Sequence, residues 1–289
     1  MTLLPSSISQ HHADYFSIIE LSDLHLFDDP NKLMNGVNTA DTFESVLSLV
    51  RQQRDDVDLL VLTGDLCHEP TPKNYDRLFA ALDDINIPFV AIPGNHDVTL
   101  ELDSHLPFAQ RRHLPVKADS RLQTRYSIAT DYWDLLLLDS SCEGHSHGEF
   151  DEQSLRWLAQ QLANADRPCA IFCHHPMVLI DSAWLDKYTI INSERFWEVV
   201  MPYLDRIKAI FVGHIHQEMH KITYGTSVFG CPSTSLQFKP LCKDYTIDEI
   251  APGLRWINLY NNGLLATGIK RTDTCLLYTS DAADDMQCV

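Results

Sequence analysis

Short apolar runs alternate with amphipathic segments along the first third of the chain. The runs at 15–22, 57–65 and 89–94 are rich in Ile, Leu and Val, as expected of buried β-strands. Between them, apolar residues recur every three to four positions at 39–53 and 73–85, which is the period of an amphipathic α-helix. Strands that alternate with helices form parallel sheets through right-handed crossovers. The pattern therefore predicts an α/β fold.

The rest of the chain continues this alternation less regularly. Further strands are expected at 133–138, 169–173, 208–212, 227–230 and 255–260, and further helices at 151–164 and 193–206. No internal repeat or low-complexity linker interrupts them. We expect one domain over 15–272, preceded by a disordered leader at 1–14. The tail at 273–289 lacks the periodicity of the preceding chain, and we interpret it as non-native or disordered.

Polar clusters follow five of the strand-like runs. They are "SDLH" with Asp23 and His25, "TGD" with Asp65, "PGNHD" with Asn95 and His96, "CHHP" with His174 and His175, and "GHIH" with His214 and His216. One such cluster alone is weak evidence, because H-x-H at a strand end is more often a packed or surface pair. Five together favour one site, since ligands of open α/β sheets bind beyond the carboxyl ends of the strands.

Seven of these side chains offer oxygen or nitrogen donors, which are too many for one metal ion and suit two. We assign Asp23, His25 and His216 to the first ion, Asn95, His174 and His214 to the second, and Asp65 to a bridging position. In both D-x-H and H-x-H, the two-residue period of a strand is expected to point the paired side chains the same way. Imidazole-rich shells suit Fe, Mn or Zn better than Ca or Mg.

Charge and cysteine content narrow the class of partner. The formal net charge is −18, which argues against binding to nucleic acid or to an anionic membrane. No apolar run is long enough to span a bilayer, and no secretory signal is apparent, so we expect a cytoplasmic enzyme. The eight cysteines form no Cys-x-x-Cys pair, which argues against structural zinc and favours reduced thiols.

The order D-x-H, G-D, G-N-H-D, H-H-P, G-H-x-H resembles the signature of the calcineurin-like metallophosphoesterases. The chain looks closer still to the bacterial 3′,5′-cyclic-AMP phosphodiesterases of that family, on segments 26–43, 182–192, 213–218, 231–240 and 247–259. The resemblance runs from about residue 16 to 271. It implies a four-layer αββα sandwich with two mixed β-sheets, hydrolysis of cyclic AMP to 5′-AMP at a dinuclear centre, and a monomer.

Two adjacent histidines compete for one ligand position in "CHHP". The resemblance places a metal ligand in this segment and favours His174 over His175. Relatives carry a third histidine where this chain has Cys173, so a shift of the ligand by one residue remains an alternative. Strand alternation is expected to let only one of the two histidines face the metals. Cys173 itself is expected to be a buried, apolar side chain.

The expected reaction is in-line attack on phosphorus by a hydroxide that bridges the two ions. Asp65 and His96 are the catalytic candidates, with His96 orienting the phosphate or protonating the departing 3′-oxygen. A structural role is the alternative for His96. Asp97 either fixes that ring or, as a turn residue, bonds backbone amides. The side chains expected to contact the substrate are His25, Asn95, His96 and His216.

The amide of Asn95 has an electrostatic rationale at such a centre. Two divalent ions carry four positive charges, of which Asp23, Asp65 and a bridging hydroxide remove three. A neutral ligand at position 95 keeps the centre cationic for an anionic substrate. The amide oxygen can bind a metal while the NH₂ group donates a hydrogen bond to phosphate.

Weaker signals concern substrate choice. "PSTSLQFKP" offers hydroxyls, an amide and Phe238 to an adenine ring, and "GVN" at 36–38 is expected to line the same mouth; ordinary packing is the alternative for both. "GHSHGEF" at 144–150 is interpreted as a flexible loop, with substrate capping as the alternative, and His68 lacks ligand spacing.

Two rival functions stay open. One is a related enzyme acting on other phosphodiesters or phosphomonoesters, such as glycerophosphodiesters or 2′,3′-cyclic nucleotides. The other is an inactive scaffold with this fold, against which the complete set of ligand positions argues.

Overall fold

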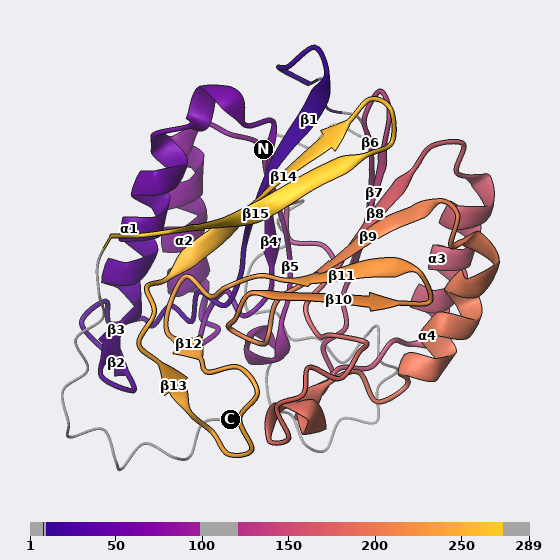
Figure 1. The fold of residues 1–289 in the computed structure, drawn as a ribbon. Helices are drawn as coiled ribbons and strands as arrows, with labels where there is room; N and C mark the ends of the chain where they lie inside the picture. Colours follow the sequence, from indigo (N-terminus) through magenta and orange to yellow (C-terminus); the bar gives the residue numbers. More distant parts are fainter. Residues whose placement is uncertain (1–7, 9, 99–120, 274–289) are drawn as a thin grey trace.

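The computed structural model describes residue 8, residues 10–98 and residues 121–273 (Figure 1). The expected leader and tail therefore lie largely outside the described residues. The described part of the leader contacts the domain, because the backbone N–H of His11 donates to the Asp58 carboxylate at 2.6 Å.

The first sheet has the strand order β15-β14-β1-β4-β5. Its strands are β1 (Tyr15–Leu21), β4 (Leu59–Thr63), β5 (Phe89–Ile92), β14 (Gly253–Tyr260) and β15 (Leu265–Arg271). The first three of these are parallel, whereas β14 runs antiparallel to β1 and β15 antiparallel to β14. The sheet is therefore mixed, with its parallel part formed by the strands that the N-terminal pattern predicts.

The second sheet has the strand order β10-β11-β9-β8-β7-β6 and is also mixed. Its strands are β6 (Arg125–Ala129), β7 (Asp134–Leu138), β8 (Cys169–Cys173), β9 (Ile207–Val212), β10 (Met219–Thr223) and β11 (Thr226–Gly230). The four central strands are parallel, and the two edge strands, β6 and β10, are antiparallel to their neighbours. Two small ribbons complete the strands: β2 (Leu33–Met34) with β3 (Val37–Asn38), and β12 (Gln237–Phe238) with β13 (Ile247–Asp248).

Helices cover the outer faces of the two sheets (Figure 1). Those beside the first sheet are α1 (Thr39–Arg51) and α2 (Pro72–Ile85), and those beside the second are α3 (Glu152–Asn164) and α4 (Ser193–Val200). Short 3-10 helices span Arg54–Asp56, Asn95–Asp97, Leu185–Tyr188 and Met201–Tyr203. Asn38 caps α1 by accepting hydrogen bonds from the amides of Ala40 and Asp41, and Thr71 caps α2.

Alternation along the strands divides the interior into three apolar layers. In β4, Leu59 and Val61 face the core between the sheets, whereas Leu60 and Leu62 face α1 and α2. The same alternation in the second sheet separates the inter-sheet core from the core beneath α3 and α4. Both sheets are thus buried on two faces, which explains their nearly continuous apolar runs. The four-layer αββα sandwich is confirmed.

The strands that the hydrophobic pattern did not predict include β6, β10 and β15, which are all edge strands. Edge strands carry more polar side chains, since their outer side is not covered, and their apolar pattern is correspondingly weaker. The helix expected at 193–206 ends at Val200, because Pro202 has no amide hydrogen to continue it.

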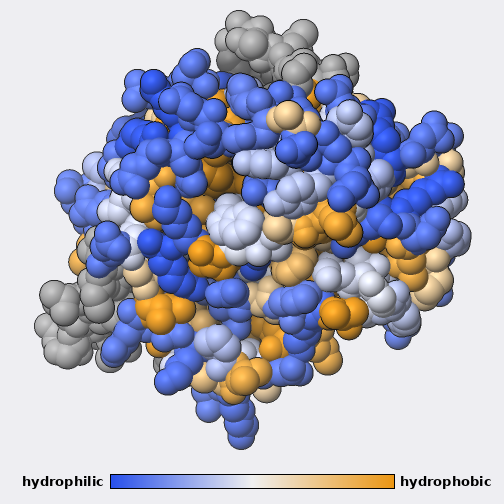
Figure 2. Space-filling model, turned by 45° about the horizontal axis from the view of Figure 1, so that its top comes forward, coloured by the Kyte–Doolittle hydropathy of each residue, from blue (hydrophilic) through white to orange (hydrophobic). Residues whose placement is uncertain are grey.

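The outer surface is mixed in character. On the face shown in Figure 2, apolar patches lie among hydrophilic residues. Within residues 10–98 and 121–273, no helix combines the length and apolar composition needed to cross a bilayer.

Candidate metal centre

Loops at the carboxyl ends of both sheets bring the polar clusters together. Asp23 and His25 follow β1, Asp65 follows β4, and His96 stands in the 3-10 helix after β5. The other clusters follow β8 and β9 of the second sheet. The backbone N–H of His214 donates to both carboxylate oxygens of Asp23, at 3.1 and 3.0 Å, so one hydrogen-bonded contact joins the loops of the two sheets.

The three side chains assigned to the first ion form one buried group. Possible ligand atoms of Asp23, His25 and His216 lie within 4.8 Å of one another. Nε2 of His216 lies 3.2 Å from Oδ1 of Asp23 and 3.1 Å from Nε2 of His25. The other ring nitrogen of His216 contacts the carbonyl oxygen of Leu236 at 2.9 Å. That contact orients the ring and leaves Nε2 directed at the group, as is usual for a metal-binding histidine.

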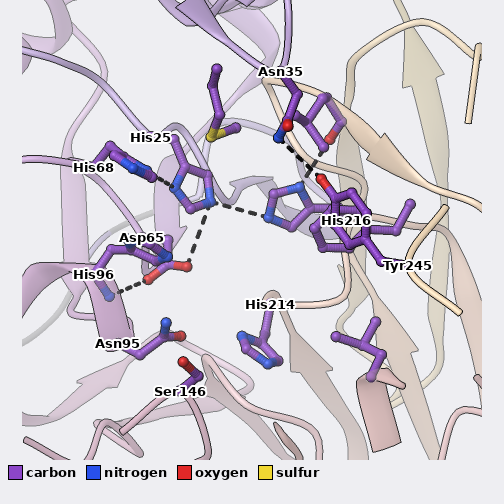
Figure 3. A pocket seen from close by; sticks show the side chains of 14 residues that line it. His25, Asn35, Asp65, His68, Asn95, His96, Ser146, His214, His216 and Tyr245 are labelled. Carbon is purple, nitrogen blue, oxygen red and sulfur yellow. Dashed lines mark hydrogen bonds and ion pairs between the residues drawn. The ribbon is translucent and has the colours of Figure 1, made fainter. Parts of the chain in front are cut away.

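Asp65 lies between this group and the second one. Its Oδ2 atom is 3.6 Å from Nε2 of His25 and 3.4 Å from Nε2 of His174. Its Oδ1 atom accepts the backbone N–H of His96 at 2.9 Å, which fixes the carboxylate (Figure 3). A carboxylate between two sets of imidazoles has the position that a bridging ligand requires.

His174 and His175 are both fully buried and both contact the second group. Nδ1 of His174 contacts the carbonyl oxygen of Thr63 at 2.6 Å, so its Nε2 faces Asp65. Nδ1 of His175 contacts Oγ of Ser140 at 2.9 Å, and its ring lies 4.5 Å from that of His214. The expectation that only one histidine faces the centre therefore does not hold. Of the two, the contact with Asp65 favours His174.

Buried polar atoms without partners mark the second group as suited to a cation. Within the described chain, Asn95 Oδ1, His174 Nε2, His175 Nε2 and His214 Nε2 are buried and have no hydrogen-bond partner. Leaving such atoms unsatisfied costs about 1–3 kcal/mol each. All four can act as acceptors toward a cation, so the donor set fits a divalent transition metal. Asn95, His174 and His214 are the ligands expected for the second ion.

The ligand-bearing loops owe their geometry to left-handed backbone rather than to strand alternation. Asp23 and His25 have φ values of 55° and 47°, and His214 and His216 have 67° and 46°. All four lie beyond the ends of β1 and β9. The expected mechanism, in which a strand points alternate side chains the same way, is therefore wrong. The paired side chains converge because the backbone turns sharply between them.

Two glycines allow the loops to approach one another. A Cβ atom on Gly64 would lie 2.5 Å from Nδ1 of His174, and one on Gly94 would lie 2.2 Å from Oδ1 of Asp65. Gly64 also has a φ of 95°, which favours glycine. Any larger residue at either position would displace a candidate ligand.

Burial and mutual contact shift the pKa values of the cluster in opposite directions. Burial raises the pKa of Asp65, but the neighbouring imidazoles, His174 first, outweigh it and hold the pKa well below its usual value. Burial lowers the pKa of His174, but Asp65 and Asp23 raise it to about 9. Burial lowers the pKa of His25 well below 6.5 and, together with His174, lowers that of His214 to about 3. His25 and His214 are thus neutral near pH 7, which metal binding requires.

Asp97 is held in a structural role. Its carboxylate accepts hydrogen bonds from the backbone amides of Gly94, Leu66 and Cys67 and from the hydroxyl of Tyr75. These bonds tie the loop after β4 to the loop after β5. The amide-bonding alternative for Asp97 is thus confirmed, and no bond to the His96 ring is involved. Cys173 is fully buried in the apolar layer beneath α3 and α4, as expected.

The cluster opens into a pocket of about 470 Å³, counting the space open to solvent at its mouth (Figure 3). The lining residues from the metal cluster and its surroundings are His25, Asp65, His68, Asn95, His96, Ser146, His214 and His216. The remaining wall consists of Met34, Asn35, Leu185, Leu236, Phe238 and Tyr245.

His68 is a pocket residue that the ligand spacing did not reveal. Its Nδ1 atom lies 3.3 Å from Nδ1 of His25, and its ring stacks on that of His96 with centroids 4.7 Å apart. Burial and His96 lower its pKa to about 4. The signal in the sequence was its place three residues after Asp65, in the same loop at the end of β4.

The substrate-recognition segments line the pocket only in part. Phe238 lines the pocket, but the hydroxyls of Ser233 and Ser235 donate to the carbonyl oxygen of Asp23 and the Gln237 amide donates to Ser233. These polar groups brace the Asp23 loop instead of facing a ligand. Similarly, Val37 of "GVN" is buried in the core, and the wall is formed by the preceding Met34 and Asn35.

Comparison with known proteins identifies the family of this chain. A family model described as calcineurin-like phosphoesterase matches residues 16–218. A probable cyclic nucleotide phosphodiesterase of Psychrobacter arcticus is 38% identical over 265 residues, covering 89% of this chain and 94% of that protein. The 3′,5′-cyclic adenosine monophosphate phosphodiesterase CpdA of Escherichia coli K12 is 34% identical over 255 residues, covering 88% and 89%.

A solved structure shows the same fold at low identity. The purple acid phosphatase PPD1 from yellow lupin seeds aligns with a TM-score of 0.68 and 14% identity, over 93% of this chain and 53% of that one. The family model spans more than half of the chain and includes all five polar clusters between Asp23 and His216. This chain therefore belongs to the calcineurin-like metallophosphoesterases.

Proposed function

We propose that this metal-dependent enzyme hydrolyses 3′,5′-cyclic AMP to 5′-AMP at a dinuclear centre. The observation that carries the proposal is the convergence of two donor groups on Asp65, with both groups facing one pocket. The relatives named as cyclic nucleotide phosphodiesterases support the choice of substrate.

The residues proposed to hold the first ion are Asp23, His25 and His216, and those for the second are Asn95, His174 and His214, with Asp65 shared. When bound, two divalent ions would supply Lewis acidity, an activated water as nucleophile and compensation for charge that develops on phosphate. Iron or manganese is the proposed pair, with zinc as the alternative. The NH₂ group of Asn95 would donate to a phosphate oxygen and so orient the substrate.

His96 is proposed to orient the phosphate. Its backbone is fixed by the bond to Asp65, and its ring is held between those of His25 and His68. Burial lowers the pKa of His96, so the neutral ring predominates near pH 7. A neutral imidazole donates a hydrogen bond readily but is a poor proton source. Orientation is therefore favoured over protonation of the leaving oxygen.

The wall opposite Asn95 is proposed to receive the nucleoside. Phe238 stacks on His216, with centroids 4.2 Å apart and planes 13° from parallel. Tyr245 lies edge-on to Phe238, and its hydroxyl accepts a hydrogen bond from Nδ2 of Asn35 at 3.1 Å. Aromatic faces beside an amide and a phenol suit a heterocyclic base.

A steady-state comparison tests this function. With Mn²⁺ or Fe²⁺ supplied, kcat/KM should be highest for 3′,5′-cyclic AMP among three substrates, the others being 2′,3′-cyclic AMP and an aryl phosphodiester. Faster turnover of either alternative would favour a related phosphodiesterase. Absence of turnover on all three would favour the scaffold.

The proposal also includes the compartment, the oligomeric state and the partners of the enzyme. We place it in the cytoplasm as a monomer whose partner is the cyclic nucleotide. The net charge of −18 supports the absence of nucleic acid and of anionic membrane among its partners.

A further inference from the structure

The loop between β7 and α3 gathers a second set of metal-binding side chains outside the pocket cluster. The loop closes at its base, where Ser141 pairs with Gly148 and the backbone N–H of Glu149 donates to the carbonyl oxygen of Ser140 at 2.9 Å. At its tip, the N–H of His145 donates to the carbonyl oxygen of Cys142 at 3.1 Å. The side chains between these bonds are thus held close together.

Three soft or borderline donors meet within this loop. Possible ligand atoms of Cys142, His145 and His147 lie within 4.8 Å of one another. The two imidazoles stack, with centroids 4.6 Å apart and planes 25° from parallel. A carboxylate lies beside the thiol of this group, since Oε2 of Glu149 is 3.8 Å from Sγ of Cys142. The spacing is Cys-x-x-His-x-His-x-Glu, which a search for Cys-x-x-Cys pairs does not find.

The charge of the loop points independently to a cation. Glu143, next to Cys142, is 9% exposed, and within the described chain neither of its carboxylate oxygens has a hydrogen-bond partner. No ion pair joins Glu143 or Glu149 to a lysine or arginine in that part of the chain. A divalent cation bound beside Cys142 would add positive charge next to Glu149 and in the same loop as Glu143, whose unpaired charge is otherwise costly to bury.

From this geometry we propose that Cys142, His145, His147 and Glu149 form a separate site for a divalent ion of the zinc class. One thiolate, two imidazoles and one carboxylate are a donor set for tetrahedral Zn²⁺. Zinc–ligand bonds of about 2.0–2.3 Å place the donors about 3–4 Å apart, which is close to the separations of at most 4.8 Å among the ligand atoms of Cys142, His145 and His147. This site is distinct from the two that we propose in the pocket.

The position of the loop gives this ion a role at the pocket. Ser146, between the two histidines, lines the pocket beside Asn95 and His214 (Figure 3). A Cβ atom on Gly148 would lie 2.6 Å from the ring of His175, so the base of the loop packs directly on the second histidine of "CHHP". With the base of the loop packed on His175, an ion bound at its tip would hold Ser146 in place. The ion would thereby set the shape of the pocket wall.

Cobalt titration of the full chain tests the site without substrate. The residues proposed to hold ions in the pocket include no cysteine, so a thiolate-to-cobalt charge-transfer band would report on this loop. We expect the band to appear by three equivalents of Co²⁺ per chain, enough for the pocket and the loop, and we expect excess Zn²⁺ to remove it and Cys142→Ser to abolish it. The matched control Cys242→Ser should keep the band. Absence of the band in the unmodified chain, or its survival in Cys142→Ser, would overturn the proposal.

A second variant guards against a folding defect in Cys142→Ser. The side chain of His145 is exposed, so His145→Ala should leave the fold intact and weaken cobalt binding at the loop at least tenfold. Unchanged affinity in this variant would remove His145 from the site. Both readouts are independent of phosphodiesterase activity, so failure of the proposed function would leave them interpretable.

Discussion

Nε2 of His174 and Oδ2 of Asp65 lie 3.4 Å apart, and both side chains are almost fully buried. The other ring nitrogen of His174 is already engaged by the carbonyl oxygen of Thr63. The imidazole therefore cannot turn away from the carboxylate. A cation between these atoms satisfies both groups, which is the basis of the predictions on the centre.

Substitution of the shared carboxylate should disable the centre. Asp65→Ala removes the group that contacts both His25 and His174, so it should lower kcat/KM by more than about 10²-fold and reduce bound metal. Elemental analysis and steady-state kinetics measure both effects. Asp134→Asn, at the start of β7, is a control for loss of an acidic side chain and should retain activity. Full activity in Asp65→Ala would contradict the shared role.

The two histidines of "CHHP" should differ in effect. His174→Ala removes an imidazole that faces Asp65, so it should lower both metal content and kcat/KM strongly. His175→Ala should reduce metal affinity by about 10–100-fold at most, as expected for a group that supports ligands. Metal titration of the two variants in parallel compares them. The reverse order would transfer the ligand role to His175.

Asn95→Asp tests the electrostatic rationale for the amide. The added negative charge should strengthen or preserve metal binding while opposing an anionic substrate. We expect KM to rise by about tenfold or more, corresponding to about 1.4 kcal/mol. Asn95→Ala, which removes the ligand without adding charge, is the matched comparison. If Asn95→Asp instead lost metal and kept KM, the amide would serve only to bind the ion.

Chelation followed by reconstitution should show that activity depends on two metal ions in the pocket. Chelation should abolish phosphodiesterase activity, and Mn²⁺ or Fe²⁺ should restore it. In Cys142→Ser, which lacks the loop site, reconstituted protein should contain close to two transition-metal ions per chain by elemental analysis. A stoichiometry of one in that variant would argue against the dinuclear centre.

A buried carboxyl below the centre should make stability depend on pH. Glu20 is fully buried, accepts a hydrogen bond from Thr63 and lies 3.9 Å from Nε of Arg255. Burial raises its pKa from 4.5 to about 8, although Arg255 opposes the rise. The folded chain therefore binds more protons at this group between pH 4.5 and 8. The contribution of the group to stability is full below pH 4.5 and falls as pH rises through that window.

Urea unfolding at pH 5 and pH 8 measures the effect of Glu20. The slope attributable to one group is at most about 1.4 kcal/mol per pH unit. Glu20→Gln should lose less stability between the two pH values than the unmodified chain does. Glu198→Gln, on the exposed face of α4, should behave like the unmodified chain. Equal losses in all three proteins would show that Glu20 keeps an ordinary pKa.

Hydrophobic periodicity was sufficient to predict the α/β class and most of the buried strands, because both sheets are covered on two faces. The four-layer sandwich itself was implied by the family resemblance. The central strands β4 and β8 have continuous apolar runs that are easily recognised. Edge strands such as β15, whose residues are all half-buried, do not carry that signal. The order of strands within each sheet depends on long-range pairing, which periodicity cannot specify.

The candidate ligands were predictable for a different reason. Oxygen and nitrogen donors that follow several strands of an α/β fold are brought to one rim by the topology itself. The spacing of these residues in the sequence could not predict which side chains contact one another in the site. His68 comes close to His25 only through the turn after β4, and the stacking of Phe238 on His216 joins two segments that no sequence period relates.

The left-handed backbone of the centre has a consequence for evolutionary drift. Ten non-glycine residues in the described chain have positive φ, and five of them are proposed ligands: Asp23, His25, Asp65, His214 and His216. Each such conformation costs about 1–3 kcal/mol, and glycine would relieve it. A lineage that no longer needed the centre would gain folding stability by losing these side chains. Their joint presence therefore means that the centre is built at the expense of folding stability.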